Sequence, residues 1–263
     1  MIAALATVLL ASAPAELAYD LRVDVPLTAT LGAWWLASET VLKRELAPAA
    51  CRWCATNGFD EAGRGLRAAP DGVKPARVTS DVLAFAVMPL GVLAADALLT
   101  WRAGGDWRDT LVDLLLVAEA VMVSQTVNQT VKLIVGRERP FVSALSPADK
   151  PLTDEPDDNN LSFYSAHAST AFSLVTAAAT IARARGYRHW WVVLAAGLPL
   201  AATTGVLRIV GDKHWVTDVL TGAALGSLVG FAMPFLFHRP VHVGPVEAEL
   251  SAAGSGFALT GRW

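Results

Sequence analysis

Three short sequences in an otherwise apolar chain contain side chains that could bind and cleave a charged substrate. They are KLIVGRERP at 132–140, FYSAHAS at 163–169 and LRIVGDKHWVTD at 207–218. Together they supply three cations, two imidazoles, one hydroxyl and one carboxylate: Lys132, Arg139, Arg208, His167, His214, Ser165 and Asp218. Ionisable groups at the ends of membrane spans are costly, so their default interpretation is functional.

These residue types match the needs of phosphate chemistry. Three fixed cations without a cage of carboxylates describe a pocket for a multiply charged anion, and Arg can bind phosphate oxygens bidentately. His214 and Asp218 are four residues apart on one helical face, so the carboxylate can hold one ring nitrogen and leave the other as a nucleophile. His167 comes from a different segment and is the natural acid for the departing oxygen. The set predicts phosphoryl transfer through a phosphohistidine.

Each of these residues also has a simpler interpretation. A Lys or Arg at a span end commonly extends its charged head to the interface, which would explain Lys132, Arg139 or Arg208 taken singly. The simpler interpretation weakens because all three clusters fall at span ends that are predicted to lie on one membrane face. Asp212 and Lys213 are expected to be turn and interface residues without a chemical role.

The composition indicates a membrane protein. The chain has 263 residues, of which 54% are hydrophobic and 17% charged, with a mean hydropathy of +0.43. A soluble domain has about 25% charged residues. The formal net charge is -3 and no run of Lys or Arg occurs, which argues against nucleic acid as a partner. Cys51 and Cys54 form a single CxxC, too little for a zinc site, and are expected to be free or locally bridged without a catalytic role.

Apolar segments of spanning length connect the three clusters. Five stand out, at 82–101, 110–135, 166–184, 190–210 and 215–237. Each approaches the roughly 20 residues with which a helix crosses about 30 Å of hydrocarbon. The shorter segment 27–41 carries Glu39 and is expected to span weakly or to lie at the interface. The predicted fold is therefore an all-α integral membrane bundle with five to six transmembrane helices.

Two features inside the spans favour helix packing. Gly222, Gly226 and Gly230 recur at four-residue spacing, which allows another helix to approach closely. Several polar side chains are expected to form hydrogen bonds between helices rather than to line a path: Asp96, Asp113, Glu119, Gln125, Asn128 and Gln129.

The arginines of the short turns predict the orientation. Arg183, Arg185 and Arg188 crowd one turn, and Arg102 and Arg108 flank another, so the positive-inside rule places both turns in the cytoplasm. The loop at 136–163 and the turn at 211–214 then face the periplasm, where all three clusters would meet.

At the level of motifs, the chain resembles the type 2 phosphatidic acid phosphatase and vanadium haloperoxidase superfamily. The resemblance rests on Lys132 with six residues before Arg139-Pro140, then Ser165-Ala166-His167, then Arg208 with five residues before His214 and three more before Asp218. It covers roughly residues 80 to 237. Two positions depart from the usual pattern: Tyr164 and Ala166 replace the Pro and Gly of Pro-Ser-Gly-His, and Leu207 replaces the Ser before the third motif's Arg.

The resemblance implies a role for each matching position. Phosphate would be bound by Lys132, Arg139, Ser165, the backbone N–H of Ala166, and Arg208. His214 would be the nucleophile, Asp218 its orienting partner and His167 the general acid, with no metal or other cofactor required.

The sequence thus predicts a membrane lipid phosphatase that acts on a phosphate monoester or diphosphate, in a bacterial inner membrane with its site facing the periplasm. The expected partners are the lipid phosphate and the bilayer, and the oligomeric state is left open. A vanadate-dependent haloperoxidase and a non-catalytic protein that binds anionic lipid are the alternatives. The predicted organisation is a signal peptide or anchor at 1–18, an interfacial connector at 19–80, the phosphatase domain at 81–238 and a tail at 239–263.

Overall fold

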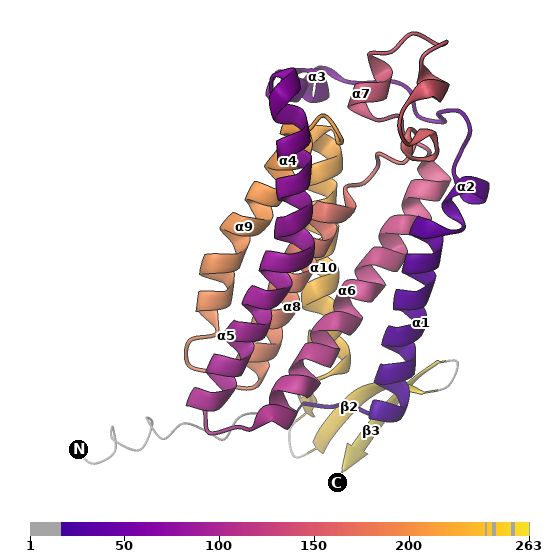
Figure 1. The fold of residues 1–263 in the computed structure, drawn as a ribbon. Coiled ribbons are helices and arrows are strands. Elements are labelled where there is room, and N and C mark those ends of the chain that lie inside the picture. The colour runs from indigo at the N-terminus through magenta and orange to yellow at the C-terminus, as the bar shows by residue number, and fades with distance from the viewer. Residues whose placement is uncertain (1–16, 240, 244–245, 254–255, 263) are drawn as a thin grey trace.

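Figure 1 shows long helices running up and down a single bundle, with short helices at one end and a small sheet at the other. The computed structural model describes residues 17–239, 241–243, 246–253 and 256–262. The predicted start of the chain, 1–18, therefore falls almost entirely outside the described residues. The long helices are α1 (Leu21–Thr40), α4 (Pro70–Val82) continuing through the π-helical η2 (Leu83–Val87) into α5 (Met88–Arg102), α6 (Trp107–Val135), α8 (Ala166–Ala184), α9 (Trp191–Val210) and α10 (Val216–Phe237).

The predicted all-α membrane bundle is confirmed. Among the described residues, four helical stretches are long and apolar enough to cross a membrane: Pro70–Arg102, Trp107–Val135, Trp191–Val210 and Val216–Phe237. Helix α8 corresponds to the predicted segment 166–184, the third of the five. It is less apolar, because it packs against α6, α9 and α10 and most of its residues are buried. A helix that faces other helices can use Ala, Ser and Thr where a lipid-facing helix needs large apolar side chains.

Helix α4 begins earlier than the sequence suggested. The connector was expected to extend to residue 80 and the first span to begin at 82, yet the helix starts at Pro70 and runs without interruption into α5. Pro is tolerated in the first helical turn because the N–H that it lacks would be unpaired there. The first part of this helix is polar, so it does not stand out as an apolar segment of the sequence. This polar part matters for function, because it carries Arg77 and Asp81 to the helix ends where the three sequence clusters lie.

Close packing of α8 on α10 fixes two of the three clusters relative to each other. Gly222, Gly226 and Gly230 are buried on α10, as the four-residue spacing predicted. A Cβ at Gly226 would lie 2.5 Å from the backbone oxygen of Ser169, and one at Gly222 would lie 2.6 Å from that of Ser165. Only glycine permits this approach, which lets the Ser165 N–H donate to the Asp218 carbonyl at 3.0 Å.

The two ends of the bundle, where the chain reverses direction, contain different kinds of structure. One end holds α2 (Lys43–Leu46), α3 (Gly58–Arg64), α7 (Pro140–Ser143), the 3₁₀ turns η3 (Lys150–Leu152) and η4 (Pro156–Asp158), and the turn after α9. The other end holds the turns after α5 and α8. An antiparallel sheet lies near this second end, in the order β1 (Val241–Val243), β2 (Val246–Ala253) and β3 (Gly256–Arg262). The sequence did not predict these strands.

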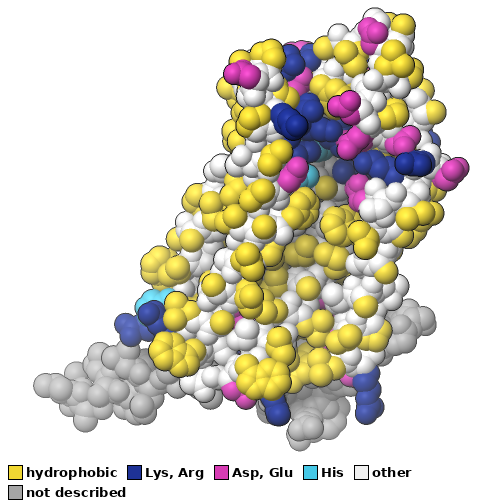
Figure 2. Space-filling model, in the orientation of Figure 1, with side chains coloured by type: hydrophobic (Ala, Val, Ile, Leu, Met, Phe, Trp, Pro, Cys, Tyr) yellow, Lys and Arg dark blue, Asp and Glu magenta, His cyan; other side chains and the backbone are white. Residues whose placement is uncertain are grey.

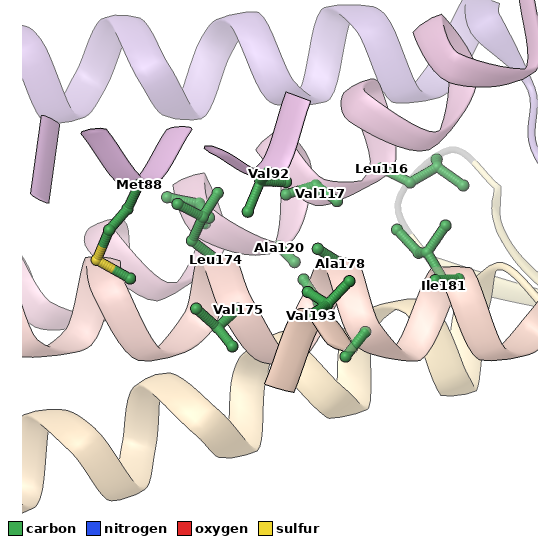
Figure 3. Packing of buried hydrophobic residues seen from close by; sticks show 14 of the residues in the cluster. Met88, Val92, Leu116, Val117, Ala120, Leu174, Val175, Ala178, Ile181 and Val193 are labelled. Carbon is green, nitrogen blue, oxygen red and sulfur yellow. The ribbon is translucent and has the colours of Figure 1, made fainter. Parts of the chain in front are cut away.

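The hydrophobic core lies between α5, α6, α8 and α9 (Figure 3). Leu116 and Ala120 of α6 are fully buried, as are Ala177 and Ile181 of α8. On α8 the core begins at Ala171, one turn beyond His167. The apolar packing therefore occupies the part of the bundle away from the start of α8, and the polar side chains gather at the other end.

Candidate functional site

A polar cavity opens at the end of the bundle where the three clusters meet. Its volume is about 560 Å³, and it is lined by six of the eight predicted site residues: Lys132, Arg139, Ala166, His167, Arg208 and His214. Figure 2 shows Lys and Arg side chains gathered with acidic groups and histidine in a hollow near the upper end, above a largely hydrophobic surface. Ser165 and Asp218 are fully buried and are not among the lining residues.

His214 is held so that one ring nitrogen is free to react. Its Nδ1 lies 2.8 Å from the carbonyl oxygen of Ser162, which can only accept, so Nδ1 carries the proton. Nε2 therefore has the lone pair, and it accepts from Arg139 Nη1 at 3.1 Å in the cavity wall. Burial and the nearby charges of Arg139, Arg208 and Lys132 hold the pKa of His214 well below its usual value. The imidazole is consequently neutral at neutral pH, as a nucleophile must be.

Asp218 supports His214 through an intermediary. Its Oδ2 is 3.6 Å from Nδ1 of His214, too far for a direct hydrogen bond. The same oxygen accepts from the Ser162 hydroxyl at 2.5 Å and from the Trp215 N–H at 3.0 Å. The carboxylate thus fixes Ser162, whose carbonyl orients the imidazole.

Each of the three predicted phosphate-binding cations faces a carboxylate. Arg139 Nη2 lies 2.9 Å from Oδ1 of Asp158. Arg208 Nη1 lies 3.0 Å from Oδ1 of Asp81, and Lys132 Nζ lies 3.7 Å from Oε1 of Glu39. These partners keep the cations in place when no anion is bound, and a phosphate can compete for them because all lie at the cavity.

His167 and Arg208 share one acidic partner. Asp81 Oδ1 lies 2.6 Å from Nε2 of His167 and 3.0 Å from Nη1 of Arg208. A negatively charged oxygen therefore already sits between the predicted general acid and a predicted phosphate-binding arginine. A phosphate oxygen in this place would contact both groups.

The start of α8 presents backbone donors to the same cavity. Ala166 is the first residue of α8 and lines the cavity. The N-terminus of α8, with the positive end of its helix dipole, therefore faces the cavity and favours anions there. The Ser165 hydroxyl accepts from the Ala168 N–H at 3.4 Å as the N-cap. In this structure the Ser165 side chain therefore caps the N-terminus of α8 and does not line the cavity.

Lys213 and Asp158 belong to the site although the sequence assigned neither a role there. Lys213 lines the cavity, which corrects its expected position as an interface residue. Burial and the charge of Arg139 lower its pKa to about 8. Asp158 pairs with Arg139, Lys43 and Lys213, whose charges outweigh burial and hold its pKa below the usual range. This loop carboxylate collects cations from three separate parts of the chain.

A second charged cluster lies behind His214, outside the cavity. Arg137 is 1% exposed, and its guanidinium lies between Oδ1 of Asp218 at 2.5 Å and Oδ2 of Asp60 at 2.6 Å. Asp60 also accepts from the Thr217 N–H at 2.9 Å, and Trp53 stacks 4.2 Å from the guanidinium carbon. The connector that carries Asp60 is thereby fastened to the first turn of α10. We call Asp60, Arg137 and Asp218 the buried triad.

The polar residues within the spans lie outside the cavity lining. The Asn128 amide donates to the Tyr164 carbonyl at 2.8 Å, just before α8. Asp113 pairs with Arg185 at 2.7 Å near the far end of the bundle. These contacts join α6 to the segments that flank α8, in keeping with the predicted structural role.

Some of the cavity residues that the sequence analysis did not identify could have been found from their spacing. Arg77 and Asp81 are four apart on α4 and line the same cavity, so they share a face as an i, i+4 pair must. Recognising Pro70 as a helix start would have revealed that face. Glu39 and Asp158 offered no comparable signal, because only tertiary contacts bring them to the cavity.

The bundle and its cavity define a class: an integral membrane protein with a cation-rich site around a neutral histidine. Residues 113–240 match the sequence model of the PAP2 superfamily. This part of the chain contains all three sequence clusters. The resemblance inferred from the motifs is confirmed.

Two examples of similar proteins are a curated relative and a solved structure. A lipid A 1-phosphatase of Porphyromonas gingivalis is 46% identical over 69 residues, which are 26% of this chain and 15% of that relative. The chain thus spans only a small part of this relative's length. The crystal structure of a transmembrane PAP2 type phosphatidylglycerolphosphate phosphatase from Bacillus subtilis superposes with a TM-score of 0.47 at 20% identity, over 78% of this chain and 93% of that one.

Proposed function

We propose that the protein is a membrane lipid phosphatase that hydrolyses a phosphate monoester or diphosphate through a phosphohistidine. The observation that carries the proposal is the neutral His214, whose unprotonated Nε2 lies in a wall of cations. The match of residues 113–240 to the sequence model of the PAP2 superfamily supports the same chemistry.

In the first step, Lys132, Arg139 and Arg208 hold the phosphate oxygens while Nε2 of His214 attacks phosphorus. The bond between phosphorus and the leaving oxygen breaks, and protonated His167 gives that oxygen its proton. The imidazole keeps its Nδ1 proton, and the Ser162 carbonyl, fixed by Asp218, stabilises the positive charge on the ring.

In the second step, His167 takes a proton from water as the water attacks phosphorus. The bond between phosphorus and Nε2 breaks, phosphate leaves, and His214 returns to its neutral form. This sequence needs no metal or other cofactor in its proton transfers. Retained phosphate release in the presence of EDTA would agree with it.

A lipid substrate is favoured by where the cavity lies. The cavity opens at the ends of the long helices, and its wall includes Trp35 of α1 and Phe85 of η2 beside the charged groups. A phosphate at the depth of the lipid headgroups can reach the cations while its apolar chains remain among the helices.

We place the site on the periplasmic side of a bacterial inner membrane. Arg183, Arg185 and Arg188 lie around the turn after α8, at the end opposite the cavity, which by the positive-inside rule is cytoplasmic. Cys51 and Cys54 form a disulfide in the connector at the cavity end. Disulfides persist in oxidising compartments such as the periplasm, so this bridge independently favours the same orientation.

The test is phosphate release from a panel of lipid phosphates by purified protein in detergent with EDTA present. We expect release by the wild type and a loss of about 10³-fold or more in kcat for His214→Ala, as expected when a nucleophile is removed. His189→Ala is the matched control, because His189 is exposed at the opposite end. Equal release by wild type and His214→Ala would refute the mechanism.

The same preparation separates the alternatives. Vanadate should inhibit phosphate release, whereas vanadate-dependent halide oxidation would favour a haloperoxidase. Binding of lipid phosphates without release by the wild type would favour a non-catalytic role.

A further inference from the structure

Arg77 differs from the other cations of the cavity wall. Lys43, Lys132, Arg139, Arg208 and Lys213 each have a carboxylate oxygen within 4.0 Å. Over the part of the chain that the structure describes, the guanidinium of Arg77 has none at that distance, although Arg77 lines the cavity. Its positive charge is therefore directly available to a ligand.

Backbone and ring contacts hold Arg77 in position without neutralising it. Its Nε donates to the Gly211 carbonyl at 2.7 Å, and its guanidinium carbon lies 5.3 Å from the centre of the Phe141 ring. The remaining guanidinium nitrogens keep their donors. A cation that is fixed in this way loses little entropy when it binds an anion.

Lys213 lies at the same part of the cavity. Its Nζ is 5.1 Å from the centre of the same Phe141 ring, and it follows Gly211 by two residues. Its Nζ lies 3.5 Å from Oδ2 of Asp158 and 3.7 Å from Oε2 of Glu155, longer than the 2.9 Å contact of Lys43 with Asp158. These long contacts allow the flexible ammonium to turn toward a ligand.

This pair adjoins the predicted reaction centre but is separate from it. Arg139 Nη1 contacts Nε2 of His214 and also donates to the Lys213 carbonyl at 2.7 Å. One arginine thus joins the reactive histidine to the backbone of the second cation. A ligand with two charged groups could occupy both places at once.

We propose that Arg77 and Lys213 form a second anionic subsite, and that preferred substrates carry a second phosphoryl group beside the one that is hydrolysed. The second group is either the inner phosphoryl of a lipid diphosphate or the phosphodiester of a headgroup. The inference rests on the proposed lipid phosphatase activity, since the subsite selects among its substrates. Arg77 is a specificity-determining residue in this account.

The test compares lipids with identical diacylglycerol chains in detergent micelles. Phosphatidic acid has one phosphoryl group, diacylglycerol diphosphate has an anhydride pair, and phosphatidylglycerol phosphate has a phosphodiester and a monoester. For the wild type we expect kcat/KM to be about tenfold higher for at least one of the two-phosphoryl lipids than for phosphatidic acid, the size of one charged contact. Which of the two lipids shows the preference identifies the source of the second group.

Variants on α4 test whether Arg77 is responsible for the preference for a second phosphoryl group. Arg77→Gln should lower the preference about tenfold, and Arg77→Lys should restore part of it. Lys74→Gln, an exposed cation one turn earlier on the same helix, should leave it unchanged. Inorganic pyrophosphate should inhibit the wild type more strongly than inorganic phosphate, and Arg77→Gln should reduce that difference.

Two outcomes overturn the inference while the proposed function survives: active wild type with no preference for a second phosphoryl group, or a preference that Arg77→Gln leaves intact. The absence of phosphate release from every lipid would instead refute the proposed function, and this inference with it.

Discussion

Two charged clusters lie on either side of His214, and both are built from Arg and Asp. In the cavity wall, Arg208 and Arg139 pair with carboxylates beside open space. In the buried triad, Arg137 is enclosed between Asp60 and Asp218, and both carboxylates are 0% exposed. The residue types are the same, but only the first cluster can exchange its carboxylates for a ligand.

The contrast separates binding from support. An enclosed ion pair that loses one partner leaves a buried charge, which costs about 3–5 kcal/mol. A cavity cation is lost with less harm to the fold, because water and neighbouring charges can compensate. Changes at Asp60 and Arg137 should therefore act mainly on stability, and changes in the cavity wall mainly on catalysis. Asp218 belongs to the triad and also supports His214, so a change there should affect both.

The largest effect on folding should come from Arg137→Met, which preserves volume but removes the charge between Asp60 and Asp218. We expect a loss of about 3–5 kcal/mol in the free energy of unfolding, seen as a lower thermal unfolding temperature in detergent. Arg44→Met, whose side chain is 82% exposed, is the control and should change little. A stable Arg137→Met protein would show that the triad does not fasten the connector.

A cavity cation should give the opposite result. Arg208→Gln is expected to lower kcat/KM by about 10²–10³-fold, the usual cost of removing one group that stabilises the transition state. Its unfolding temperature should stay close to that of the wild type, as should that of the control Arg188→Gln at the far end. If Arg208→Gln destabilised the protein as much as Arg137→Met, the division between the clusters would fail.

A smaller effect should appear in the pH dependence of phosphate binding. Because the pKa of Lys213 is lowered to about 8, its ammonium is charged below that pH and neutral above it. Competitive inhibition by inorganic phosphate should therefore weaken by up to about tenfold as the pH rises from 7.5 to 9.5. Lys213→Arg stays charged over this range and should flatten the profile. Identical profiles for the two proteins would show that Lys213 does not contact the anion.

The sequence predicted those parts of the site that depend on local spacing. Ser165 directly precedes α8, and Asp218 lies in the first turn of α10, so both positions followed from short-range signals. The expected shared helical face of His214 and Asp218 was wrong, because α10 begins at Val216 and His214 lies in the turn before it. The close packing of α10 through its glycines was predicted from spacing, since glycines four residues apart lie on one narrow face of a helix. Spacing along the chain also sufficed for the long apolar helices.

The remaining parts depend on contacts between distant segments. The direct partner of His214 is the backbone carbonyl of Ser162. Every residue has a backbone carbonyl, so the residue types in the sequence cannot indicate this contact. Asp158 collects three cations from a loop whose acidic composition gave no hint of that position. The role of Arg137 likewise depends on a tertiary contact, because its partner Asp60 comes from the distant connector.

The phosphohistidine is the central claim, and the stereochemistry at phosphorus tests it most directly. A lipid thiophosphate monoester made chiral with ¹⁸O would be hydrolysed in H₂¹⁷O, and the configuration of the released thiophosphate determined. Two successive in-line displacements, the first by His214 and the second by water, predict net retention. Inversion would mean that water attacks the substrate directly, and it would contradict His214 as the nucleophile.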